Sequence, residues 1–193
     1  MITWTFKARI LAVLGIVALA GCDELELPQA TGGGGAKALT QASLARGQVK
    51  LAAPDGYCID RRSLRARFAL LGRCDTMGVD GFFNDRDLAI ITASTLPVAA
   101  GTVSPDAAAL SAQGEVVSTE ERGGLPLVRL RDANNQIEGV GDTYWRTAIV
   151  LNDQLVSFVL YAPPGSPALG RDGARLLERA ILATRQATRL ASG

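Results

Sequence analysis

Positive charge is concentrated in one short segment, where four arginines fall within seven residues: Arg61, Arg62, Arg65 and Arg67. Guanidinium groups pair well with carboxylates and phosphates. The segment is therefore a candidate docking patch, either for anionic lipid headgroups or for an acidic protein partner. The alternative is a solvated turn, balanced by three aspartates that lie close in the sequence: Asp55, Asp60 and Asp75.

Two cysteines flank this segment, Cys58 and Cys74, and a third, Cys22, lies far upstream. The spacing of the flanking pair is not the C-x-x-C of a redox catalyst, and two thiolates without histidine make a poor zinc site. We expect a structural disulfide between them, which is typical of an oxidising compartment. Such a bridge would close a loop of about 15 residues and stabilise the fold by about 3 kcal/mol.

The sequence contains no histidine, which excludes Ser-His-Asp and Cys-His catalysis and histidine metal ligands. Glu120 and Glu121 are adjacent, so their side chains diverge on a regular element and do not form a catalytic carboxylate pair. We therefore predict a protein that is not an enzyme, with no metal and no cofactor. The balance of 20 basic against 19 acidic residues gives no reason to expect nucleic-acid binding.

Other charged groups offer weaker candidates. Arginines recur at helical spacing near the carboxyl end and mark either the wet face of an amphipathic helix or a phosphate-facing stripe: Arg171, Arg175, Arg179, Arg185 and Arg189. Five oxygen-bearing residues share a glycine-containing loop, with a spacing that misses the calcium-loop pattern: Asp75, Asp80, Asn84, Asp85 and Asp87. Together with Arg129 and Arg131, this loop would supply the polar groups of the alternative function, a periplasmic module that binds a small ligand or an ion.

The amino terminus has the anatomy of a secretory signal peptide at residues 1–21, with Lys7 and Arg9 followed by an apolar run. As a helix, that run of eleven residues, Ile10 to Ala20, would span only about 17 Å, well short of a hydrocarbon core of about 30 Å. It ends in Leu19-Ala20-Gly21-Cys22, which resembles the lipobox of bacterial lipoproteins. The resemblance implies that Cys22 receives a diacylglyceryl group, that cleavage occurs before it, and that its new amino group is acylated. The alternative is a conventional cleaved signal with an incidental cysteine.

The resemblance also implies a location on the periplasmic face of a bacterial cell membrane. Asp23 resembles the inner-membrane retention signal of enteric lipoproteins, so we favour the inner membrane and keep the outer membrane as an alternative. After Cys22, Pro28 and the run Gly32–Gly35 are typical of a flexible linker. We therefore predict a lipid anchor and linker at 22–47 and one globular domain at 48–193.

Within the domain, Asp60–Leu71 is ambiguous, since Asp60 also suits the cap of an amphipathic helix. Such a helix would hold its ends about 18 Å apart, whereas disulfide partners need Cα atoms about 4.4–6.8 Å apart. We therefore predict a hairpin, with Tyr57–Asp60 returning through Phe68–Cys74. The remaining predicted elements are a buried strand at 88–92, a helix from Ser104 to Ala112, a strand at 126–131, two strands at 143–151 and 154–161 joined by Asn152-Asp153, and a helix at 172–190.

This order predicts an α+β fold, an antiparallel sheet backed by helices with a long C-terminal helix. The element order, the strand that contains Trp145 and the closing hairpin and helix resemble the PsbP-like fold, over about residues 48–191. Members of that fold include photosystem accessory proteins and bacterial lipoproteins. The resemblance implies an accessory or docking protein of an envelope assembly, with the lipid bilayer and an unidentified envelope protein as its partners.

Overall fold

The computed structural model describes residues 38–76, 88–112, 114–132 and 139–192. The expected signal peptide at 1–21, Cys22 and the first part of the linker lie outside the described residues, as do Asp80, Asn84, Asp85 and Asp87. The described residues all belong to one unit of the chain, Gly35–Gly193.

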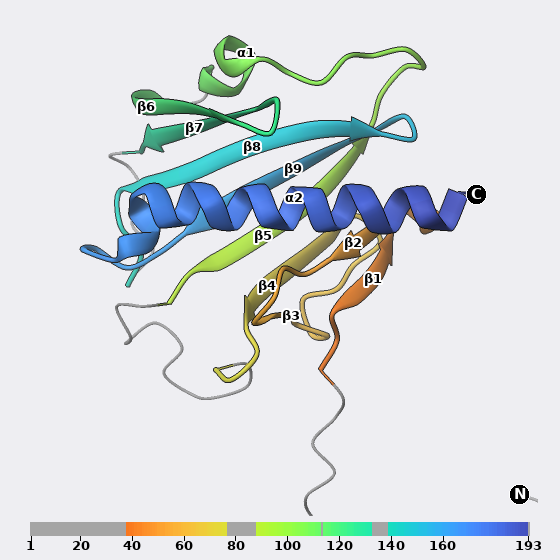
Figure 1. The fold of residues 1–193 in the computed structure, drawn as a ribbon, viewed down its shortest axis with the longest axis horizontal. Coiled ribbons are helices and arrows are strands. Elements are labelled where there is room, and N and C mark those ends of the chain that lie inside the picture. The colour runs from red at the N-terminus through yellow and green to blue at the C-terminus, as the bar shows by residue number, and fades with distance from the viewer. Residues whose placement is uncertain (1–37, 77–87, 113, 133–138, 193) are drawn as a thin grey trace, which may run out of the picture. The chain divides into compact units, whose positions relative to one another are not determined.

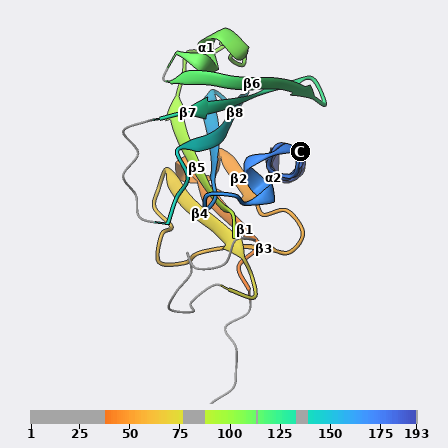
Figure 2. The ribbon, with the colours of Figure 1, turned by 90° about the vertical axis from the view of Figure 1, so that its left-hand side faces the viewer.

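Seven antiparallel strands form the main sheet, in the order β3-β4-β5-β9-β8-β7-β6, and β1 and β2 form a separate two-stranded ribbon (Figure 1). The long helix α2 crosses one face of the sheet beside this ribbon (Figures 1 and 2). The elements run in chain order β1 (Gln41–Leu44), β2 (Val49–Ala52), β3 (Tyr57–Ile59), β4 (Phe68–Arg73), β5 (Ile90–Pro97), α1 (Ala107–Ser111), β6 (Glu115–Arg122), β7 (Leu125–Arg131), β8 (Thr143–Leu151), β9 (Gln154–Tyr161) and α2 (Arg171–Ser192). The predicted α+β architecture is confirmed.

Alternation along the strands gives the sheet two different faces. On β9, Val156, Phe158 and Leu160 are fully buried in the large core beneath α2. The opposite face carries a second, smaller cluster around Leu110 of α1, made of Val128, Leu130 and Ala148. The main core therefore lies between α2 and the sheet, and α1 covers part of the other face.

The β8–β9 hairpin follows the sequence prediction. Asn152 and Asp153 both have positive φ, 47° and 56°, which is the conformation of a type I′ turn and one that Asn and Asp tolerate better than most residues. The strands on either side pair from Leu151–Gln154 to Trp145–Leu160.

The helix α2 is fixed to the sheet by apolar and polar contacts. Its predicted apolar face is buried, namely Leu176, Leu177, Ala180, Ile181 and Thr184. The indole Nε1 of Trp145 donates to the carbonyl oxygens of Leu169 and Gly170, at 3.2 and 3.0 Å. These two carbonyls precede the first turn of α2, so Trp145 ties the start of the helix to the centre of the sheet.

The amino-terminal boundary of the domain was predicted wrongly. Residues 41–47, assigned above to the linker, form β1 and a 3₁₀ turn at Ala45–Gly47. Leu44 and Ala45 are buried because β1 pairs with β2 and lies over the core. The folded part therefore begins several residues before position 48.

Four further elements differ from the predictions. The helix α1 begins at Ala107 and not near Ser104, since Asp106 caps it by accepting a hydrogen bond from the Ala109 N–H at 2.8 Å. Ser104 Oγ instead accepts from the N–H of Val150. The strand expected at 88–92 runs from Ile90 to Pro97, and neither β2 nor β6 was predicted.

Candidate docking surface

The β3–β4 hairpin carries the predicted disulfide. Cys58 in β3 and Cys74, directly after β4, are bonded, with a Cα–Cα distance of 4.9 Å. Tyr57 pairs with Arg73 and Ile59 with Leu71 in antiparallel register. The helical alternative for this segment is therefore excluded, and the bridge closes the end of the hairpin opposite its turn.

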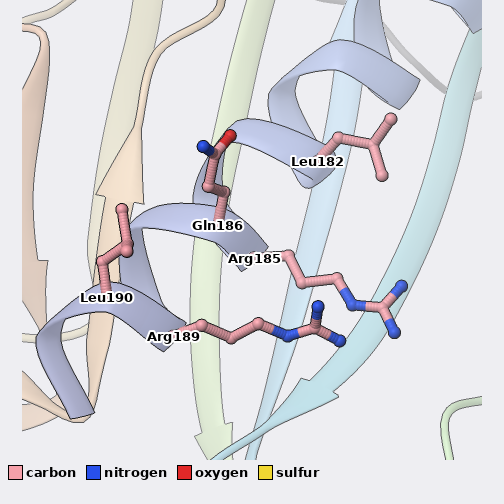
Figure 3. Close-up of a pocket in the computed structure, with 5 residues that line it drawn as sticks. All are labelled: Leu182, Arg185, Gln186, Arg189 and Leu190. Carbon is pink, nitrogen blue, oxygen red and sulfur yellow. The ribbon is translucent and has the colours of Figure 1, made fainter. Parts of the chain in front are cut away.

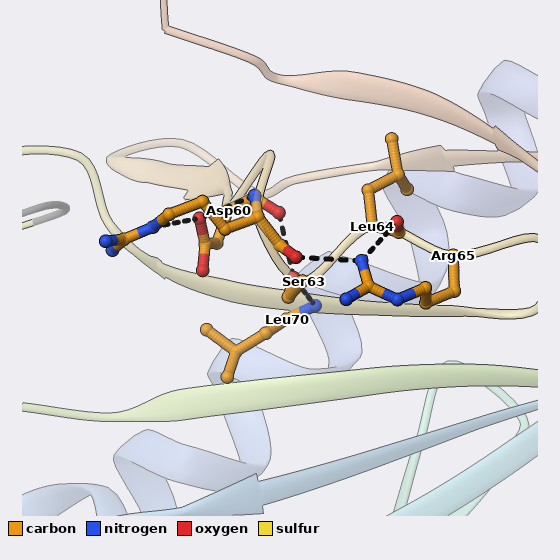
Figure 4. A network of polar contacts seen from close by, with 6 residues as sticks. Asp60, Ser63, Leu64, Arg65 and Leu70 are labelled. Carbon is orange, nitrogen blue, oxygen red and sulfur yellow. Dashed lines mark hydrogen bonds and ion pairs between the residues drawn. The ribbon is translucent and has the colours of Figure 1, made fainter. Parts of the chain in front are cut away.

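The turn at residues 60–67, called the basic turn below, has an internal polar framework (Figure 4). Ser63 Oγ donates to the Asp60 carbonyl oxygen and accepts from the Leu70 N–H, both at 2.8 Å. The Asp60 carboxylate accepts from the Arg62 N–H at 3.0 Å. Because these bonds tie the turn to β4, its arginines project from a defined backbone.

All four arginines of the basic turn are exposed. Arg62 lies 3.4 Å from the Asp60 carboxylate, an ion pair in which the Arg62 side chain is 80% exposed. The Arg65 guanidinium donates to the carbonyl oxygens of Arg62 and Leu64 (Figure 4), contacts that leave its charge uncompensated by a carboxylate. With Asp60 as its one acid, the segment keeps a net positive charge of about three at neutral pH.

The other two nearby aspartates do not neutralise the basic turn. Asp75 forms a two-point ion pair with Arg73, at 3.1 and 2.6 Å, and this hydrogen bonding holds the pKa of the Asp75 carboxyl below its ordinary value. Asp55 lies just before β3, where the Tyr57 N–H donates to the Pro54 carbonyl oxygen. Both aspartates are thus at the disulfide end of the hairpin.

Three neighbours extend this surface and were not singled out from the sequence. The Ala45 N–H donates to the Ala66 carbonyl oxygen at 2.7 Å, which brings the exposed Arg46 close to the basic turn. Phe68 and Leu96 are 38% and 59% exposed. Phe68 of β4 pairs with Ser94 of β5, and Leu96 follows Ser94 by two residues on the same strand. Phe68 and Leu96 are therefore diagonal neighbours on the sheet face opposite α2.

The arginines of α2 have separate environments. Arg175 pairs with Asp172 at 3.1 Å near the start of the helix. Near its end, Arg185 and Arg189 line an open cavity of about 480 Å³ (Figure 3), with Leu182, Gln186 and Leu190. The helix therefore does not present one continuous arginine stripe to a single site.

The groups expected to serve a ligand-binding cleft are divided among different partners. Arg129 donates to the Leu169 carbonyl oxygen at 2.9 Å, beneath the start of α2. Arg131 pairs instead with Glu115 and Asp142, at 3.3 and 3.4 Å. Among these groups, each described side chain is engaged in a local contact, and Asp75 is held by Arg73 in the same way.

The two adjacent glutamates of β6, Glu120 and Glu121, have different neighbours. Glu120 pairs with Arg122 at 2.7 Å, and Arg122 reaches Glu178 of α2 at 4.0 Å. Glu121 borders an open cavity of about 410 Å³ together with Arg185.

Among the described residues, no group of three metal-ligating side chains comes together. No helix in this part of the chain is long and apolar enough to cross a membrane.

The three tyrosines all have perturbed hydroxyls. Burial raises the pKa of Tyr57, which borders a cavity of about 190 Å³ at the start of α2. Burial likewise raises the pKa of Tyr144 and of Tyr161, whose ring centroids lie 5.6 Å apart on the face opposite α2. The charge of Asp132 also raises the pKa of Tyr144 and of Tyr161, and the charge of Arg146 lowers it, both less strongly than burial acts.

No protein-family model matches the chain, and no curated protein matches it. Similar solved structures include a point mutant of the protein Mog1, at 13% identity and a TM-score of 0.42, covering 77% of this chain and 90% of that one. The Ran-binding protein Mog1p of Saccharomyces cerevisiae is 13% identical, with a TM-score of 0.41, and the match covers 77% of this chain and 89% of that one. Cyanobacterial PsbP from Synechocystis is 13% identical, with a TM-score of 0.42, and the match covers 79% of this chain and 94% of that one. The PsbP-like resemblance expected from the order of elements thus has a weak match among solved structures.

Proposed function

We propose that this chain is a non-catalytic accessory protein of a bacterial envelope, held to a membrane by acyl chains on Cys22 and docked through its basic turn onto an anionic component of that envelope. The observation that carries the docking role is the exposed positive charge of a turn fixed by an internal hydrogen-bond framework. An arginine surface of this kind suits docking better than catalysis, because guanidinium groups bind carboxylates or phosphates.

The anchoring role is supported by the sequence Leu19-Ala20-Gly21-Cys22 and its flanks. Two or more acyl chains satisfy the physical requirement for stable membrane attachment. The Cys58–Cys74 bridge fits an oxidising compartment such as the periplasm. We place the protein on the periplasmic face of the cell membrane, with Asp23 favouring the inner membrane over the outer membrane.

Intact mass of the detergent-extracted protein tests the anchor. The wild-type chain should begin at Cys22 and carry lipid mass, and the Cys22→Ser variant should carry none. A wild-type mature form without lipid would contradict the anchor.

Photo-crosslinking in cells tests the docking role. A photoreactive residue in place of the exposed Ala66 should give a reproducible adduct with one envelope component. The matched control places the same residue at the exposed Gln186 of α2, where we expect no such adduct. Absence of an adduct at Ala66, together with thermal stabilisation of the purified protein by a small ligand, would replace docking by the ligand-binding function.

A further inference from the structure

We infer that the anionic surface met by the basic turn is the headgroup layer of the membrane that carries the acylated Cys22, so that the turn orients the domain on that membrane. This inference rests on the proposed anchoring. It goes beyond the docking role because it names the occupant of the turn and assigns the turn an orienting function.

The path of the chain supports this assignment. The Ile59 N–H donates to the Leu39 carbonyl oxygen at 2.7 Å, and the Ala45 N–H donates to the Ala66 carbonyl oxygen at the same distance. The segment from Leu39 to Ala45 therefore runs beside the basic turn, and β1 and the β3–β4 hairpin lie together where the chain enters the domain (Figure 1). Any anchor upstream of Leu39 pulls on the domain next to its arginines.

The length of the preceding chain keeps the turn close to the bilayer. Leu39 follows Cys22 by about 17 residues, which span at most about 60 Å when fully extended. A flexible linker of that length, which the sequence predicts, would have a root-mean-square reach of about 20–25 Å. An acylated Cys22 would thus hold the basic turn within a few Debye lengths of the surface, each about 8 Å at physiological salt.

The chemistry of the surface fits a lipid headgroup layer. The basic turn carries a net positive charge, to which Arg46 adds on the neighbouring strand connection. Phe68, which directly follows the turn, and Leu96 add exposed apolar side chains on the sheet face opposite α2. Arginine with adjacent aromatic and aliphatic side chains is the composition that peripheral proteins place in the headgroup region. An acidic protein would match the charge but would not by itself explain why the anchor enters beside it.

Arginine modification on vesicles provides the test. The lipidated full chain is reconstituted into vesicles of phosphatidylcholine alone or of phosphatidylcholine mixed with phosphatidylglycerol. Phenylglyoxal, a neutral reagent, then modifies accessible arginines, and peptide mass spectrometry reports the rate at each one. On anionic vesicles we expect the rate in the basic turn to fall about tenfold and to recover at high salt. Arg171 and Arg175, at the start of α2, should react equally on both vesicles.

Paired variants sharpen the result. Replacing Arg61 and Arg62 by Ser should restore modification of the remaining Arg65 and Arg67 on anionic vesicles. The matched control, Arg171→Ser/Arg175→Ser, removes the same charge and should leave the protection of the basic turn unchanged.

The outcomes separate this inference from the proposed function. Failure to float with phosphatidylcholine vesicles would contradict the anchor, whatever the arginines do. Flotation with equal modification of the turn on both vesicles would overturn the orienting role. In that case, protection of the turn in native membranes alone would assign it to an acidic protein partner. Protection of Arg185 and Arg189 in place of the turn would assign the membrane to α2 and equally overturn the inference.

Discussion

Removing the disulfide between Cys58 and Cys74 is the most direct perturbation of the scaffold that presents the basic turn. Cys74 follows Cys58 by 16 positions in the sequence, and the whole turn lies between them. Replacing both by Ala avoids a free thiol, and treating the wild-type protein with a reductant provides the same perturbation without a substitution.

The magnitude follows from the size of the closed loop. In the chain-entropy model, a loop of this length lowers the entropy of the unfolded state enough to contribute about 3 kcal/mol of stability, within a general range of about 2–5 kcal/mol for native bridges. For a folded unit of this size, each kcal/mol shifts Tm by about 2–4 °C. We therefore expect Tm to fall by about 6–12 °C on reduction.

Thermal unfolding monitored by circular dichroism, with and without reductant, measures this shift. The Cys58→Ala/Cys74→Ala variant is the control, because its Tm should already be low and should not respond to reductant. Non-reducing peptide mapping should recover the two cysteine peptides linked. An unchanged Tm on reduction of a demonstrably linked wild-type protein would refute the reasoning that the bridge constrains the unfolded chain.

Three further predictions concern α2 and the tyrosines. Gly173→Ala should lower the free energy of unfolding by about 1–3 kcal/mol in urea titrations, because a Cβ there would meet the Ala168 carbonyl oxygen inside van der Waals distance. Thr184→Val should cost about 1–3 kcal/mol in the same assay, since the buried Thr184 Oγ1 accepts from the Ala52 N–H at 3.2 Å. Absorbance at 295 nm should show that the tyrosine hydroxyls of the native protein titrate with midpoints above the ordinary pKa near 10, because burial raises the pKa of Tyr57, Tyr144 and Tyr161. The free energy of unfolding should fall as pH rises through these raised pKa values.

Each of these predictions has an internal control. Gln186→Ala on the exposed face of α2 should change stability by less than about 0.5 kcal/mol, whereas helix propensity alone would make Gly173→Ala stabilising by about 1 kcal/mol. Thr184→Ser keeps the hydroxyl and should be milder than Thr184→Val. The protein unfolded in guanidinium should titrate its tyrosines near pH 10, and a native curve that coincides with it would contradict burial of the phenols.

Local patterns were enough to predict much of the fold. The apolar face of α2 repeats at helical spacing over several turns, and the β8–β9 hairpin is marked by strong strand formers around Asn152-Asp153. The β3–β4 hairpin was predicted by a long-range constraint, because the distance between bonded cysteines excludes a helix between them. These features depend on residues close in sequence or on covalent geometry.

The sequence analysis missed features of the fold that depend on contacts between residues distant in the sequence. The strand β6 is rich in charged residues, interrupted by a bulge between Val116 and Ser118, and lies at the sheet edge, so its apolar alternation is weak. Residues 41–47 follow a glycine-rich segment and show too short a pattern to separate a strand from a linker. Thr184 and Thr188 of α2 bond to the backbone of Ala52 and Lys50, contacts that no helical periodicity reveals.

The candidate surface was predicted in part for the same reason. The cluster from Arg61 to Arg67 is visible in the sequence because its members are consecutive, whereas Arg46 joins it through the pairing of Ala45 with Ala66. The balance of charge also needed the structure, because Asp55 and Asp75 lie near the arginines in sequence but at the disulfide end of the hairpin in the fold. Only Asp60 lies in the turn.

The proposed anchor would set how firmly the protein is held on the membrane, and the basic turn would set how the domain is oriented there. Burial of acyl chains contributes about 0.8 kcal/mol per CH₂ group, so two or more chains on Cys22 would exceed by far the contribution of the arginines, about 1 kcal/mol for each net charge near an anionic surface. Retention on the membrane is then set by Cys22. Three net charges placed at one end of a rigid domain still favour one orientation over its opposite by about 3 kcal/mol, or about 100-fold. Loss of the arginines should therefore leave the protein in the membrane fraction and change which face the domain presents to its surroundings.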